Sequence, residues 1–331
     1  MKRFFRSTLL AQVGIALGMA ITAPSHANVA DWEADPRPVR IVVAFPAGGY
    51  TDVIGRVMAN ELGKIIKRNF IVENKVGANG VIGTAAVARS KADGDTLLLA
   101  APGHVTNSLI MSEVPYDPNK DFAPILKVAT VPNVLVVMPN SPFKSVRDII
   151  EAAKAQPGLI TYASGGIGSS NHLAMELLMK MTGAPLKHIP YKGSSLAETD
   201  VAGGHVQMMF SGAGSAVTQI KGGKLRAIAV SSKERISSLP DVPTVAEAGV
   251  KGYAFESWLG LFAPANTPKD IVEKLNAAVN TVMQNPEVMS RLKSLGVDKF
   301  EPSSVKDFTE FLDQETKQQA ALVASFGDIK Q

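Results

Sequence analysis

Several short turns rich in glycine and hydroxyl residues have the composition of an anion-binding site. The first, residues 46–52 (Pro-Ala-Gly-Gly-Tyr-Thr-Asp), follows an apolar run at 39–45 and precedes an amphipathic segment at 53–67, an order that predicts strand, turn and helix. Backbone N–H groups at Gly48 to Thr51 would then lie where helix amides lack intrahelical partners and the macrodipole is positive. Such a turn can bind an anion. Taken alone, the turn fits an ordinary tight connection equally well.

Four further turns repeat this composition. They lie at residues 103–107, 164–170, 192–195 and 211–213, each after a predicted strand. Because ordinary turns need not all lie at the carboxyl ends of strands, their recurrence favours an anion site over turn geometry alone.

Several polar and charged side chains near these turns could have either a structural or a ligand-binding role. Thr51 or Asp52 could cap the helix that follows the first turn. Asp52 and Asp200 are the acidic residues nearest the predicted site, and either could pair with a ligand ammonium or hydroxyl group. Lys192 could face a ligand carboxylate, although an exposed loop lysine is commoner.

The turns lack the signatures of the common catalytic and nucleotide sites. The run Gly166-Ile167-Gly168 continues to Asn171 where a dinucleotide fingerprint needs glycine, and there is no Walker motif or Gly-x-Ser-x-Gly elbow. No histidine pair has the His-Glu-x-x-His spacing. We therefore expect no catalytic residue, no metal and no cofactor. A hydrolase remains the open alternative, with His104 or His172 as base and a loop serine as nucleophile, one of Ser164, Ser169 and Ser170.

The first 27 residues have the order of a secretory signal peptide. A basic start (Met-Lys-Arg-Phe-Phe-Arg) leads into an apolar run at 9–21, which is shorter than the roughly 20 residues of a membrane span, and then into Ser25-His26-Ala27. We expect cleavage after Ala27 and a soluble periplasmic protein. Removal of three basic residues lowers the formal net charge from +4 to +1, so the charge gives no support to nucleic-acid binding. The absence of cysteine excludes disulfides and thiolate chemistry.

Apolar strands alternate with helical segments in two series, which predicts an α/β fold with parallel sheets. A proline-rich passage at 115–132 separates the series, and the apolar run at 258–263 is predicted to return to the first. We expect a two-lobe architecture with two crossover connections. Lobe I would comprise residues 28–127 and 254–331, and lobe II residues 128–253. Ligands of such sheets bind beyond the carboxyl ends of the strands, in this case between the lobes.

Motifs along almost the whole mature chain resemble the periplasmic solute-binding proteins of tripartite tricarboxylate transporters. They are Phe-Pro-Ala-Gly-Gly-x-Thr-Asp at 45–52, Val-Glu-Asn-Lys-x-Gly-Ala-x-Gly at 72–80, Tyr-Asp-Pro-x-x-Asp-Phe-x-Pro at 116–124, Tyr-Ala-Ser-x-Gly at 162–166, His-Ile-Pro-Tyr-Lys-Gly at 188–193, Gly-Lys-Leu-Arg-Ala at 223–227 and Leu-Pro-Asp-Val-Pro-Thr-x-x-Glu-Ala-Gly at 239–249. One departure is Gly55 before Arg56, where the family commonly has alanine; glycine weakens a helix by about 1 kcal/mol relative to alanine.

The resemblance implies a Venus-flytrap protein that captures a small organic acid and delivers it to a membrane permease of one large and one small subunit. It implies that backbone and hydroxyl groups hold the ligand carboxylate at Gly48, Gly49, Thr51, Asp52, Ser164, Gly166, Ser169, Lys192, Gly193 and Asp200, with Ser170 in the same loop. Tyr50, His104, Asn107 and His172 are our candidates for the far end of the ligand. We expect a monomer that does not bind nucleic acid. A ligand-dependent partner of a sensor protein would use the same site, and the sequence does not separate that role from transport, nor a dicarboxylate from an aromatic acid.

Overall fold

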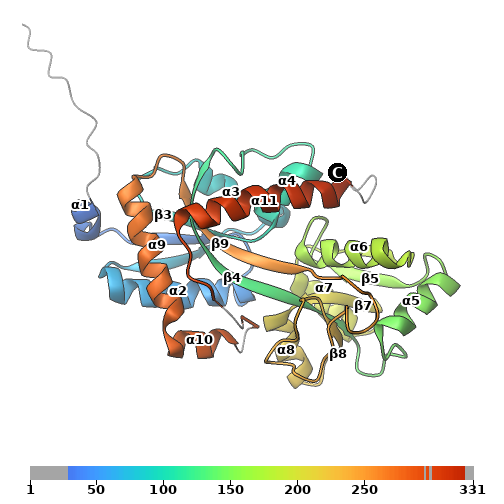
Figure 1. Ribbon diagram of the computed structural model, residues 1–331. Helices are drawn as coiled ribbons and strands as arrows, with labels where there is room; N and C mark the ends of the chain where they lie inside the picture. The colour runs from blue at the N-terminus through green and yellow to red at the C-terminus, as the bar shows by residue number, and fades with distance from the viewer. Residues whose placement is uncertain (1–28, 294–295, 298–299, 325–331) are drawn as a thin grey trace, which may run out of the picture.

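The computed structural model describes residues 29–293, 296–297 and 300–324. The predicted signal peptide and its cleavage after Ala27 lie outside the described residues. The described chain forms two α/β parts joined by long strands (Figure 1). We call the part with the N-terminal sheet lobe I and the other part lobe II.

Lobe I is built on three parallel strands, β1 (Val39–Val43), β2 (Phe70–Asn74) and β3 (Thr96–Ala100), in the order β2-β1-β3. Its first helices are α1 (Val29–Ala34), α2 (Tyr50–Ile66), η1 (Ala78–Gly80), α3 (Val81–Ala88) and α4 (Gly103–Ile110). Every residue of β3 is buried, as expected for a strand covered on both faces. The carboxyl ends of these strands lead into α2, η1 and α4.

Lobe II repeats this plan with a second sheet. Its strands are β5 (Thr161–Ser164), β6 (Lys187–Pro190), β7 (Met208–Gly212) and β8 (Arg226–Val230), and its helices are α5 (Val146–Ala155), α6 (Ser170–Thr182), α7 (Ser194–Ala202) and α8 (Ala213–Lys221). Strand β5 pairs in parallel with both β6 and β7. The carboxyl ends of β5, β6 and β7 therefore lie on one edge, where α6, α7 and α8 begin.

Two strands connect the lobes. Strand β4 (Phe122–Val137) pairs with β9 (Glu256–Pro264) along 122–132 and with β7 and β8 along 133–137. We expected a proline-rich passage between the lobes, and part of it forms β4, with Pro124 and Pro132 inside the strand. A register shift next to Pro124 lets the strand continue past a residue that cannot donate a ladder hydrogen bond. The α/β fold with two crossing connections is confirmed (Figure 1).

The last three helices of the described residues are α9 (Lys269–Gln284), α10 (Pro286–Lys293) and α11 (Val305–Ala324), and they return to lobe I (Figure 1). Ile271, Leu275, Val279 and Val282 share one face of α9 and are buried. Pro268 is the N-cap residue of α9, and the Thr267 hydroxyl donates to the Pro264 carbonyl.

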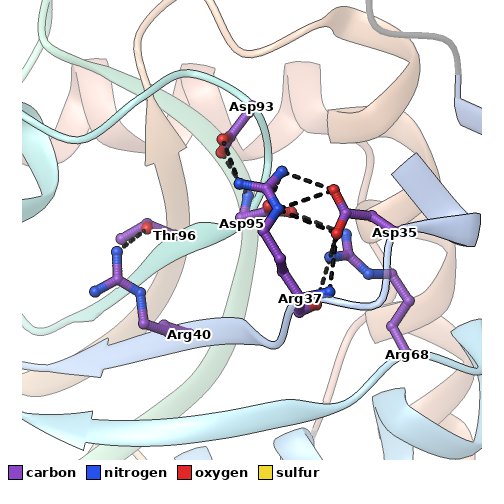
Figure 2. A network of polar contacts seen from close by, with 7 residues as sticks. All are labelled: Asp35, Arg37, Arg40, Arg68, Asp93, Asp95 and Thr96. Atoms are coloured by element: carbon purple, nitrogen blue, oxygen red, sulfur yellow. Dashed lines mark hydrogen bonds and ion pairs between the residues drawn. The ribbon is translucent and has the colours of Figure 1, made fainter. Parts of the chain in front are cut away.

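A charged network fastens the amino edge of the lobe I sheet. Figure 2 shows Arg37 and Arg68 between Asp35, Asp93 and Asp95. Asp35 and Arg37 precede β1, Arg68 precedes β2, and Asp93 and Asp95 precede β3. Arg68 Nη1 lies 2.9 Å from Asp95 Oδ1, and Arg37 Nη2 lies 2.7 Å from Asp95 Oδ2. Because these residues precede the strands, the network lies at the opposite edge from the strand-to-helix turns and leaves the carboxyl edge to the candidate site.

Two elements differ from the sequence prediction in a way that matters for the site. Residues 103–107 and 211–213 were expected to be loops, yet α4 starts at Gly103 and α8 starts at Ala213. Both helices are rich in glycine, serine, threonine or alanine, whose composition resembles a turn. Helix α4 packs against α11, α3 and η1, and α8 packs against β4, β7 and β8, and this packing outweighs the local preference. The site is consequently lined by more helix starts than expected.

Candidate functional site

The first glycine turn is held by a side chain from inside the helix that follows it. Helix α2 begins at Tyr50 and its N-cap, Gly49, has no side-chain cap. Thr51 and Asp52 are therefore helical residues, and the prediction that either caps the helix was wrong. Instead, Gly48, with φ +80°, donates its amide to Asp52 Oδ2 at 2.9 Å. The Gly48 amide is thus bound within the turn, whereas the first amides of α2 have no intrahelical acceptor.

Asp52 is engaged by three donors. Besides the Gly48 amide, Arg56 Nε donates to Asp52 Oδ2 at 2.9 Å and Asn74 Nδ2 to Oδ1 at 2.9 Å. Burial tends to raise the pKa of this carboxyl, but Arg56, the Gly48 amide and Asn74 together hold the pKa below its ordinary value. Asp52 is therefore an ionised residue that shapes the turn.

The lobe II loop at 164–170 is bonded mainly to itself. The Gly166 amide donates to Ser164 Oγ at 3.1 Å, and Ser169 Oγ donates to the Gly166 carbonyl at 2.6 Å. Ser169 is also the N-cap of α6, with Ser170 as the first helical residue. These bonds fix the loop at the amino end of α6, where the macrodipole favours a negative ligand group.

Two stacked histidines lie behind this loop. The rings of His172 and His188 have centroids 4.3 Å apart, and Tyr162 stacks on His188 at 4.8 Å. His172 Nδ1 accepts from the Gly168 amide at 3.2 Å, and its Nε2 lies 3.6 Å from Glu176 Oε1. Burial lowers the pKa of His172 to about 3, with a further contribution from His188, whose own pKa is lowered to about 4 by burial. His172 thus holds the loop as a neutral acceptor.

The other two polar residues expected at the far end of the ligand have structural partners in lobe I. His104 lies in an aromatic cluster with Tyr116, Phe122 and Phe262, and its Nε2 lies 3.2 Å from the Pro118 carbonyl. Burial lowers its pKa to about 4. Asn107 Oδ1 accepts from Asn79 Nδ2 at 2.9 Å, which ties α4 to η1. The structure therefore gives both side chains packing roles, because α4 turns them into lobe I.

The acidic residue between the starts of α7 and α8 is Glu198, which was not among the predicted ligand-binding residues. Ser211 Oγ donates to Glu198 Oε1 and Ser215 Oγ to Oε2, both at 2.5 Å. Burial raises the pKa of Glu198, against the two hydroxyl donors. Asp200, which we had selected, accepts from the Tyr191 hydroxyl at 2.5 Å. Glu198 follows Ser194 by four residues, so the helical period places them on one face, a signal that could have identified it.

At the start of α7, the backbone and a serine face the neighbouring loop. Lys192 is exposed, and Gly193 is the N-cap of α7 with φ +126°. Ser194 Oγ donates to Asn171 Oδ1 at 2.9 Å. A Cβ atom at Gly165 would lie 2.7 Å from Ser194 Oγ, so only glycine fits where the two turns meet.

The two lobes touch at these turns. A Cβ atom at Gly212 would lie 3.4 Å from the Tyr50 ring, so the start of α2 in lobe I faces the start of α8 in lobe II. Thr106 Oγ1 in α4 donates to the Gly168 carbonyl at 3.3 Å. The start of α8 thus contacts the start of α2, and the 164–170 loop contacts α4, so turns of lobe II meet helix starts of lobe I.

Comparison with known proteins agrees with this arrangement. Residues 54–327 match the family described as "Tripartite tricarboxylate transporter family receptor". The chain belongs to this family. It is therefore a solute-binding receptor rather than an enzyme, and the hydrolase alternative is not supported.

Solved structures of similar sequence share the fold. The chain is similar to "R. palustris Rpa4515 with adipate", with TM-score 0.84 and 34% identity, covering 88% of this chain and 98% of that one. It is similar to "periplasmic binding protein BugD", with TM-score 0.83 and 34% identity over 90% and 100% of the two chains. It is also similar to MatC from Rhodopseudomonas palustris with bound malate, with TM-score 0.80 and 30% identity over 87% and 100%. The family places the receptor in the periplasm.

Two absences within residues 29–293, 296–297 and 300–324 concern metal binding and membrane insertion. No cluster of three or more His, Cys, Asp or Glu side chains there could hold a metal ion. None of the helices in those ranges combines the length and the apolar character needed to cross a membrane.

Proposed function

We propose that this receptor binds a small organic carboxylate between its lobes and delivers it to a tripartite tricarboxylate-type permease. The observation that carries the proposal is the approach of Tyr50 at the start of α2 to Gly212 at the start of α8. Two helix starts that face each other from different lobes offer backbone amides and positive dipole ends to one anion. The bound adipate and malate of two relatives support a carboxylate as that anion.

Ligand capture follows a two-state equilibrium. The carboxylate binds amides at the start of α2, to which Gly49, Tyr50 and Thr51 belong, and lobe II closes over it. The ligand stabilises the closed state only through the contacts that closure adds. No arginine is needed, because several N–H donors share the charge. Gly166, Ser169, Ser170 and Gly193 are the proposed contacts from lobe II.

The remaining expectations are part of the proposal. The mature protein begins after cleavage at Ala27, acts as a monomer and docks on a permease of one large and one small subunit. Its lobe I comprises residues 28–127 and 254–331, and its lobe II residues 128–253. A sensor-partner role would use the same cleft, and uptake by a deletion strain distinguishes it from transport.

A thermal-shift panel tests the proposal. Monocarboxylates, dicarboxylates, tricarboxylates, aromatic acids and neutral sugars would be added to the purified mature protein. We expect a rise in Tm with at least one carboxylate and none with sugars, since ligand binding stabilises the folded state. Stabilisation by sugars and by no carboxylate would show the proposal to be wrong.

A further inference from the structure

One buried apolar cluster of lobe II contains two side chains from lobe I. In the described residues, its other buried members lie in lobe II, whereas Ile110 is the last residue of α4 and Val323 lies in the last turn of α11. Ile110 is only 1% exposed. Figure 1 shows α4 and the end of α11 on the side of lobe I that faces α6. Two helices of lobe I thus bury their ends against the core of lobe II.

Helix α4 is divided between the two lobes. Val105, near its start, belongs to a separate buried cluster with residues of β1, β3 and β9. Ile110, at its end, belongs to the lobe II cluster, and α11 packs against α4. A buried isoleucine stabilises a contact through the apolar surface that it removes from water. Separation of the lobes at α4 would return part of that surface to water.

The 164–170 loop of lobe II leaves room for Ile110. Gly168 is buried with φ +77°, and a Cβ atom there would lie 2.9 Å from Ile110 Cδ1. Carbon atoms prefer separations of about 3.5 to 4.0 Å, so the missing side chain lets Ile110 approach the loop. The Gly168 amide donates to His172 Nδ1 at 3.2 Å, which holds the loop to lobe II. Ile110 therefore meets a fixed surface.

A polar contact lies beside this apolar one and contributes less. Thr106 Oγ1 of α4 lies 3.3 Å from the Gly168 carbonyl oxygen and 3.2 Å from the Pro102 carbonyl oxygen. A hydroxyl group has one proton to donate, and Pro102 precedes the same helix, so its carbonyl still accepts that proton when the lobes are apart. The apolar contact of Ile110 therefore favours closure more than the hydrogen bond does.

We propose that Ile110 and Val323 form a clasp that holds the two lobes together in the ligand-free receptor. The inference rests on the two-state closure of the proposed function, but not on the identity of the ligand. The clasp populates the closed state before the ligand binds, so the ligand's own contacts supply only the remaining stabilisation. Ile110 is thus a positioning residue, which acts through the ratio of closed to open molecules.

Distances between two spin labels on the full mature protein test the clasp without ligand. The chain has no cysteine, so Asn60→Cys on α2 and Lys154→Cys on α5, both exposed, take one label each. Unfolding, dialysis and refolding remove any co-purified ligand. The otherwise wild-type protein should then show mainly the label separation of the structure.

Two variants should open the lobes. Ile110→Val removes Cδ1, the atom that lies nearest to Gly168, and should lower the closed-to-open ratio about 2- to 10-fold, the range for one buried methylene group. Val323→Ala, on a different helix, should shift the ratio in the same direction and keeps the test valid if the first variant folds poorly. Thr106→Val should change the ratio less than about twofold.

A matched control separates the clasp from general destabilisation. Ile149→Val makes the same change in the same cluster, but on α5 at the end of lobe II far from lobe I (Figure 1). This control should lower Tm and leave the label separation unchanged. A purely structural role of Ile110 would likewise lower Tm without opening the lobes.

Three results would overturn the clasp. They are a wild type that shows only a longer separation without ligand, a short separation that neither Ile110→Val nor Val323→Ala lengthens, and an equal shift in Ile149→Val and Ile110→Val. None of them concerns carboxylate binding, which the thermal-shift panel measures separately. A panel in which sugars and no carboxylate stabilise the protein would instead refute the proposed function and leave the label distances to decide the clasp.

Discussion

The Gly168 amide donates to Nδ1 of His172 at 3.2 Å, so a neutral histidine holds the residue at which the lobe II loop meets lobe I. The same Gly168 accepts from Thr106 of α4 through its carbonyl. A proton on Nδ1 would break the first bond and put a positive charge beside His188. The contact between the lobes is therefore linked to the protonation state of His172.

Acid should destabilise the protein through this histidine. The folded-state pKa of His172 is lowered to about 3 and that of His188 to about 4, below the ordinary 6.5. Their contribution to stability is present above pH 6.5 and is lost as the pH falls below it, by up to about 1.4 kcal/mol per pH unit for each group. Thermal unfolding between pH 7.5 and 4.5 measures the loss.

A variant separates this histidine from other acid-sensitive groups. His172→Asn keeps an acceptor for the Gly168 amide but does not titrate, so its Tm should fall less steeply with acid. Burial raises the pKa of Glu176, so protonation of this residue favours the folded state as the pH falls. Glu176 is present in both proteins and does not affect the comparison. Identical slopes for the wild type and His172→Asn would contradict the assignment.

Asp52 should matter for both stability and binding, because it shapes the first turn. Asp52→Ala leaves the Gly48 amide, Asn74 and Arg56 without their acceptor. We expect a loss of about 1 to 3 kcal/mol in the free energy of unfolding and weaker ligand binding. Denaturant unfolding and titration calorimetry measure the two effects. Asp313→Asn, at an exposed position on α11, is the control and should retain wild-type affinity.

The contact between Tyr50 and Gly212 should control closure. Gly212 has φ −56°, so a larger residue is allowed by the backbone, but the side chain of Gly212→Leu would collide with the Tyr50 ring. We expect at least about a tenfold loss of affinity with little change in Tm, since the clash arises only when the lobes approach. In the Tyr50→Ala background, the same change should have a much smaller effect. Additive losses in this double-mutant cycle would refute the contact.

Glu198 should support the starts of α7 and α8. Glu198→Ala leaves the buried Ser211 hydroxyl and the half-buried Ser215 hydroxyl without their acceptor. We expect the free energy of unfolding to fall by about 1 to 3 kcal/mol, measured in urea. Glu198→Gln keeps an acceptor oxygen and should lose less. A loss as large in Glu198→Gln as in Glu198→Ala would indicate that the charge, rather than the hydrogen bonds, is what stabilises this corner.

Local sequence signals predicted most of the fold. The apolar run at 96–100 is a buried strand because both faces are covered by helices. Ser145 and Ser304 open helices through side-chain bonds that depend only on residues three positions away. Such patterns are readable because the interacting residues are neighbours in the chain. The family motifs and the glycine turns, which indicate a carboxylate receptor, are local in the same sense.

The tertiary structure decided which polar residues meet. His104 and Asn107 looked like site residues, but α4 turns them into the packing of lobe I. Ser211 and Ser215 are contributed by β7 and α8, so no local pattern predicts that Glu198 accepts from them, although its spacing from Ser194 places both residues on one face of α7. The sequence by itself determined an α/β receptor with anion-binding turns. Only the folded chain determined that Tyr50 meets Gly212 and that Thr106 bonds to Gly168, since these contacts join segments from different lobes.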